Sequence, residues 1–129
     1  MKREQFFAIA GVVGALFGLG FLLLPDMSLG TYGVPVDPHN LMQARYFGSA
    51  LLAVGLMTFL ARETQDAAAI RAVLMGNLVG DIAGGVVTLM ALGIMNSMAL
   101  GSLVIYVLFA AGSAWFLFAA KQSAQPQSA

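Results

Sequence analysis

The 129-residue chain contains no cysteine and only one histidine, His39. Without cysteine it forms no disulfide, no iron–sulfur cluster and no thiolate zinc site. One histidine is also too few for a haem or a metal site built on several imidazoles. We therefore expect no metal and no cofactor in this chain.

Charged residues are equally scarce, at 9% of the sequence, and six Lys and Arg balance six Asp and Glu. A formal net charge of zero provides no positive field to hold nucleic acid, so no nucleic-acid partner is expected. Hydrophobic residues reach 60%, against about 45–50% in soluble domains. A small domain leaves much of its surface in contact with the surroundings. We therefore expect those surroundings to be a lipid bilayer.

Four apolar stretches divide the chain, each close to the about 20 residues that cross the hydrocarbon layer. Backbone groups find no water inside lipid, so each stretch is expected to be a helix. The predicted fold is all-α: an antiparallel bundle of four transmembrane helices in one domain, 1–121. The predicted helices are about 5–24, 38–62, 67–93 and 97–120. The polar residues 122–129 are expected to be a disordered cytoplasmic tail.

Turn and cap residues separate the predicted helices. Pro25 is expected to end the first helix, and Asp37 followed by Pro38 to begin the second. The residues between them, 26–36, are predicted to be an irregular loop at the membrane interface. Cap candidates for the third and fourth helices are Thr64, Asp66, Asn96 and Ser97.

The basic residues predict an orientation in the membrane. Those at helix ends or in connections are Lys2, Arg3, Arg62, Arg71 and Lys121. All five fall at the N-terminus, the second connection or the C-terminal end, and the other two connections have none. By the positive-inside rule we expect a multi-pass inner-membrane protein with both termini in the cytoplasm.

Small residues recur every four positions in two of the predicted helices. The rows are Ala10, Gly14 and Gly18 in the first helix, and Ala72, Gly76, Gly80 and Gly84 in the third. Such rows let two membrane helices approach closely. We expect the first helix to pack on the third through these glycines, with a homodimer interface as the alternative.

Polar residues inside the apolar stretches form the candidate site. Asn77 and Asp81 share one helix face, and Asp81 lies roughly 16 Å into the bilayer. A carboxylate at that depth either finds a cation or holds its proton. Arg45 is the one basic residue well inside a stretch, and it either turns inward to Asp81 or extends to the headgroups. The predicted intramembrane polar cluster is Arg45, Asp81, Asn77, Ser49 and Tyr106.

The sequence also resembles a known family. The matching residues are Ala44–Gly48, Leu51–Leu52, Gly55–Leu56, Leu78–Asp81, Asn96 and Tyr106–Ala110. They are similar to bacterial four-helix membrane proteins that carry a domain of unknown function. The resemblance implies the four-helix fold and no activity. Relatives of this kind often have Asn or Asp at the position of Asp81, which favours a polar packing role there over an obligate proton carrier.

No nucleophile–base pair, phosphate-binding loop or metal motif is present in the sequence, so we do not expect an enzyme. The leading hypothesis is an accessory or interaction subunit of the inner membrane, self-associating or part of a larger complex. The alternative is a small transporter or lipophilic-ligand binder that uses Arg45 and Asp81. A cavity lined by Arg45 and Asp81 and open to lipid or the periplasm would favour the binder, and a dry, fully paired cluster would favour the accessory subunit.

Overall fold

The computed structural model describes the backbone of residues 1–123 and the side chains of residues 1–119. This part of the chain contains helices and no strand. They are α1 (Arg3–Leu23), α2 (Pro25–Thr31), α3 (Pro38–Leu60), the short 3-10 helix η1 (Ala61–Glu63), α4 (Ala67–Ala91) and α5 (Met98–Ser123). Four helical segments, α1, α3 with η1, α4 and α5, are long and apolar enough to cross a membrane. The predicted all-α class and the four apolar helices are confirmed.

Side-chain caps explain where the long helices begin. The carboxylate of Asp37 accepts the backbone N–H groups of His39 and Asn40, both at 2.9 Å, at the start of α3. At the start of α4, Asp66 accepts the N–H of Ala69 at 2.6 Å. Asn96 accepts the N–H of Met98, at 3.0 Å, at the start of α5. Each cap satisfies a backbone donor that has no partner inside its own helix.

The region after Pro25 differs from the prediction. Residues expected to form an irregular loop are partly helical, because α2 covers Pro25–Thr31. Proline fits the first position of a helix, where no backbone N–H is needed, so Pro25 both ends α1 and begins α2. Of the predicted tail, residues 122 and 123 belong to α5, and 124–129 lie outside the described residues.

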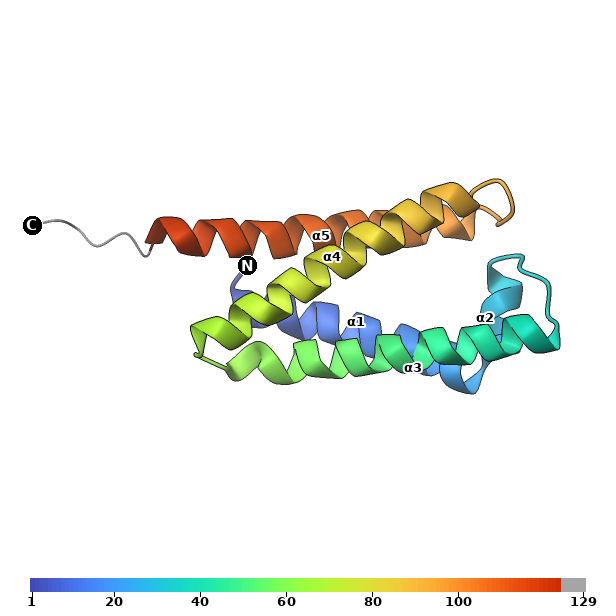
Figure 1. The fold of residues 1–129 in the computed structure, drawn as a ribbon, viewed down its shortest axis with the longest axis horizontal. Helices are drawn as coiled ribbons and strands as arrows, with labels where there is room; N and C mark the ends of the chain where they lie inside the picture. Colours follow the sequence, from blue (N-terminus) through green and yellow to red (C-terminus); the bar gives the residue numbers. More distant parts are fainter. Residues whose placement is uncertain (124–129) are drawn as a thin grey trace, which may run out of the picture.

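The long helices pack as two pairs, α1 with α3 and α4 with α5 (Figure 1). The N-terminus and the connection from α3 to α4 lie at one end of the molecule. Helix α2 and the connection from α4 to α5 lie at the other end. Contacts between the two pairs are sparse along their length, which leaves space between them.

The α1/α3 pair is held by a seam of buried glycines, which we call the glycine seam: Gly11 and Gly18 of α1 with Gly48 and Gly55 of α3. A Cβ atom added at Gly48 would lie 2.5 Å from the backbone nitrogen of Leu22 and 2.7 Å from the carbonyl oxygen of Gly18. The two backbones are therefore in direct contact, as small residues allow between apolar helices.

The sequence analysis expected the helix at 5–24, which is α1, to pack on the helix at 67–93, which is α4. This expectation is wrong. Gly14 and Gly18 face α3, whereas a Cβ added at Gly76 or Gly80 of α4 would meet no atom within 4 Å. Gly84 does pack, but against the ring of Tyr106 on α5. The partner of α1 is α3 because α3 also carries two glycines seven residues apart, which match Gly11 and Gly18 when the helices run in opposite directions.

The two helix pairs are joined at both ends. At the N-terminal end the buried side chains of Phe6, Phe7, Leu74 and Leu117 form the core, which links α1, α4 and α5. At the other end Asn96 donates its backbone N–H to the carbonyl oxygen of Tyr32 (3.0 Å) and its side-chain amide to that of Thr31 (2.8 Å). The middle of the molecule is left less filled than its ends.

We expect Gly48→Ala to lower the melting temperature in detergent and Gly80→Ala to leave it unchanged or raise it. At both positions alanine favours the helix over glycine by about 0.5–1 kcal/mol. At Gly48 the new methyl group meets backbone atoms, so a net loss of about 1–3 kcal/mol is expected. Thermal unfolding followed by circular dichroism measures both variants. Equal melting temperatures would contradict the glycine seam.

Candidate functional site

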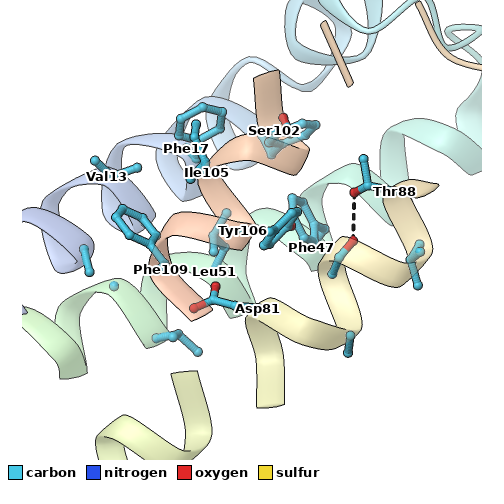
Figure 2. A pocket seen from close by; sticks show the side chains of 18 of the residues that line it. Val13, Phe17, Phe47, Leu51, Asp81, Thr88, Ser102, Ile105, Tyr106 and Phe109 are labelled. Atoms are coloured by element: carbon cyan, nitrogen blue, oxygen red, sulfur yellow. Dashed lines mark hydrogen bonds between the residues drawn. The ribbon is translucent and has the colours of Figure 1, made fainter. Parts of the chain in front are cut away.

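A cavity of about 470 Å³ lies between the α1/α3 pair and the α4/α5 pair, and we call it the cleft. Its volume is within the about 300–1,000 Å³ of small-molecule sites. Figure 2 shows side chains of all four long helices around it. Residues that line it include Val13, Phe17, Phe47, Leu51, Asp81, Thr88, Ser102, Ile105, Tyr106 and Phe109.

Tyr106 is positioned by a glycine on the neighbouring helix. A Cβ atom at Gly84 would lie 2.5 Å from the ring of Tyr106, so the ring rests directly against the backbone of α4. This contact also sets the register of α4 and α5, which run in opposite directions. Counting from it, Asp81 is level with Phe109, and Asn77 is level with Ser113.

Several polar groups of the cleft have partners within the protein. The side-chain amide of Asn77 donates to the hydroxyl oxygen of Thr58 at 3.1 Å, and that hydroxyl donates back to Asn77 Oδ1 at 3.2 Å. This pair connects α3 to α4. Thr88 donates to the carbonyl oxygen of Gly84 at 2.8 Å within its own helix (Figure 2).

A second hydrogen-bonded pair lies at the end of the cleft near α2. The hydroxyl groups of Tyr32 and Ser102 share a hydrogen bond of 2.6 Å, which ties the segment after α2 to α5. Tyr32 is buried, so its hydroxyl group needs a hydrogen-bond partner within the protein. Ser102 provides that partner. The Asn77–Thr58 pair and the Tyr32–Ser102 pair therefore bridge the helix pairs toward opposite ends of the cleft.

Three polar side chains of the cleft, those of Asp81, Tyr106 and Ser113, have no hydrogen-bond partner among the described residues. Asp81 is half-buried, points from α4 into the cleft (Figure 2), and forms no hydrogen bond or ion pair with residues 1–119. Ser113 is fully buried, and its hydroxyl oxygen also has no hydrogen-bond partner in that part of the chain. Buried polar groups are normally paired, so the unpaired carboxylate of Asp81 marks its part of the cleft as a place for a polar ligand atom.

The predicted polar cluster is only partly assembled. Asn77, Asp81 and Tyr106 line the cleft, whereas Arg45 and Ser49 are exposed and lie outside it. No ion pair joins Arg45 to Asp81. The ion pair found in the described part of the chain joins Arg62 to Glu63 at 2.7 Å.

The exposure of Arg45 follows from how α3 packs. Ala44 and Gly48 are buried against α1, and each next residue along a helix is rotated by about 100°. Arg45 and Ser49 each follow one of these buried positions and therefore lie to one side of the buried face, where they are exposed and outside the cleft. Ser49 donates its hydroxyl to the carbonyl oxygen of Tyr46 at 2.9 Å, within its own helix.

Thr58 and Ser113 are cleft residues that the sequence analysis missed. Ser113 lies seven positions after Tyr106, hence on the same helix face, and this spacing was the available signal. The sequence has no comparable spacing that would place Thr58 in the cleft, since its partner Asn77 belongs to a different helix. Groups of three or more His, Asp or Glu side chains that could hold a metal ion are absent from the described residues.

No family model, no curated protein and no solved structure matches the chain. The resemblance to bacterial four-helix membrane proteins stays a prediction. The function is therefore argued from the cleft itself.

We expect Thr58→Val and Asn77→Leu each to lower stability by about 0.5–1.5 kcal/mol, because each removes the same side-chain link between α3 and α4. The double variant should lose little more than either single variant, since the two residues interact with each other. Ser49→Ala is the control, because it removes a hydroxyl group that bonds only within α3. Thermal unfolding in detergent measures all four variants, and additive losses would contradict the link.

Proposed function

We propose that this chain is a four-span antiparallel bundle in a membrane and binds a lipophilic small molecule in the cleft between its two helix pairs. The observation that carries the proposal is the cavity of about 470 Å³ between these pairs. Ligand sites of this kind are mostly apolar and carry a few placed polar groups. The cleft has this composition, with Asp81 and Ser113 as polar groups that lack a protein partner.

Phe17, Phe47 and Val87 line the cleft and are exposed, so the cleft is open to its surroundings. They belong to three of the four long helices that are apolar enough to cross a membrane. In a bilayer these residues would face the hydrocarbon layer, so a lipophilic molecule can enter the cleft directly from the lipid.

The second candidate function is an accessory or interaction subunit. The open space at Gly76 and Gly80 favours it, because exposed small residues let a helix of another chain approach closely. We favour ligand binding because Asp81 faces an open cleft instead of a paired polar cluster.

We propose that the end bearing the arginines faces the cytoplasm and that the membrane is a bacterial inner membrane. Arg3 donates to the carbonyl oxygen of Thr64 at 2.8 Å, so the start of α1 is fixed to the connection between α3 and α4. Arg62 stacks over the ring of Phe59, with its guanidinium carbon 4.0 Å from the ring centroid. The opposite connections carry no Lys or Arg. This asymmetry supports the orientation by the positive-inside rule.

Reporter fusions test that orientation. Alkaline phosphatase, which is active only in the periplasm, should be active when fused after Ser97 and inactive when fused after Lys121. A fluorescent reporter that folds only in the cytoplasm should give the reverse pattern. Phosphatase activity after Lys121 would overturn the proposed orientation.

We expect the cleft to bind methylpyrene, a neutral apolar probe, as a single saturable adduct counted by native mass spectrometry of protein released from micelles. Val13→Trp fills the cleft and should weaken this binding by at least about tenfold. Val12→Trp is the matched control, because the neighbouring Val12 is exposed and does not line the cleft. It should leave binding unchanged.

Melting temperatures of both tryptophan variants are compared first, so that only folded protein enters the titration. If the wild-type protein binds no methylpyrene, or if the two variants bind equally well, the cleft is not a binding site. The accessory-subunit function would then be favoured.

A further inference from the structure

Resting on the proposed function, we propose that the ligand is an amphipathic cation: an apolar molecule whose protonated amine is bound by the carboxylate of Asp81. The cleft would hold the apolar body among its aromatic and aliphatic side chains. The amine would lie at the centre of the cleft, where the protein leaves Asp81 without a partner.

The charges around the cleft support a positively charged ligand. Asp81 is the one acidic residue among those that line it, and Lys, Arg and His are absent from the lining. The titratable groups that share the lining are the phenols of Tyr32 and Tyr106, and neither carries positive charge. An unpaired, ionised carboxylate in apolar surroundings is strongly unfavourable. A cation supplied by the ligand is therefore the complementary partner.

Arg45, the basic residue that might have served as an internal counter-ion, does not reach the site. It is exposed on α3 and does not line the cleft. Its direction is set by the buried neighbour Ala44, which packs against α1. The negative charge of Asp81 is therefore left for a molecule that enters the cleft.

Aromatic side chains supply a second preference for a cation. Phe17, Phe47, Tyr106 and Phe109 line the cleft and come from α1, α3 and α5 (Figure 2). The faces of aromatic rings attract ammonium groups when the rings lie within about 6 Å. Phe109 is level with Asp81 in the α4/α5 register, so a ring and a carboxylate lie at the same depth.

Among the polar groups of the cleft that lack a partner, Asp81 is the one that can carry a negative charge at neutral pH, whereas Tyr106 and Ser113 present neutral hydroxyl groups. Asn77 and Thr58 bond to each other, and Thr88 bonds to the backbone of its own helix. Ser113, which is level with Asn77, has a free hydroxyl group in the described structure. An ammonium group that enters the cleft can therefore donate an N–H to the carboxylate of Asp81 in a charge-assisted hydrogen bond.

Three pyrene probes of nearly the same shape test the proposal: methylpyrene, hydroxymethylpyrene and aminomethylpyrene, of which only the last is a cation at neutral pH. Native mass spectrometry of the full chain measures the affinity of each. We expect wild-type protein to bind aminomethylpyrene at least about tenfold more tightly than the two neutral probes.

Asp81→Asn should remove this preference and leave methylpyrene binding unchanged, because it removes the charge and keeps the size of the side chain. Asp26→Asn is the matched control: Asp26 is exposed on α2 and lies outside the cleft, so the preference should persist. Asp81→Glu keeps the charge and should keep a preference for the amine.

The outcomes separate this inference from the proposed function. If methylpyrene does not bind, the cleft is not a ligand site and the proposed function is wrong. If methylpyrene binds but the amine is not preferred, or if the preference survives Asp81→Asn, the cation inference is overturned and the proposed function stands. Equal binding of the amine and the alcohol overturns it as well, because Asp81 would then act as a neutral hydrogen-bonding group. Should Asp81→Asn fail to fold, the three probes on wild-type protein still decide whether the cleft binds a ligand and whether it prefers the amine, and Asp81→Ala then tests whether that preference depends on the carboxylate.

Discussion

The direct backbone contact between α1 and α3 is the constraint on which the rest of the arrangement depends. Gly11 and Gly18 face Gly48 and Gly55, and a Cβ atom added at any of these four glycines would lie under 3 Å from a backbone atom of the other helix. Because this contact permits only one rotation of each helix, it decides which other side chains face inward. Thr58, three residues after Gly55, is turned toward α4, and Arg45 is turned outward.

The cleft exists because the long helices associate as two tight pairs that meet mainly at their ends. Each helix pair is tight, through the glycine seam in one case and through Gly84 and Tyr106 in the other. The pairs meet at their ends, at the Phe6 core and at Asn96. In water an apolar gap between them would tend to close, because its surface would have to be hydrated. In the bilayer that we propose, lipid tails are as apolar as the lining, so little drives such a gap to close.

Some polar residues of the cleft form hydrogen bonds between helices, whereas Asp81 does not. Thr58 with Asn77, and Tyr32 with Ser102, form hydrogen bonds that connect one helix pair to the other. These links join the helix pairs on either side of Asp81. Asp81, between them, has no such partner in the described structure, and it is therefore available to a ligand. The division explains why the ligand hypothesis depends on Asp81 rather than on all the polar residues of the four long helices.

The sequence by itself determined the number and approximate extent of the apolar helices and the cap at Asp37, and it narrowed the other two caps to Thr64 or Asp66 and to Asn96 or Ser97. These features depend on residues that are adjacent in the chain, so local rules suffice. It also identified Asn77, Asp81 and Tyr106, because polar residues are conspicuous inside apolar segments. Only the tertiary structure decided that α1 pairs with α3, that Gly76 and Gly80 stay open, and that Arg45 and Ser49 lie outside the cleft. The physical reason is that these helices are apolar on all sides, so hydrophobicity does not mark the buried face. Which face is buried depends on how small residues of two distant segments fit together.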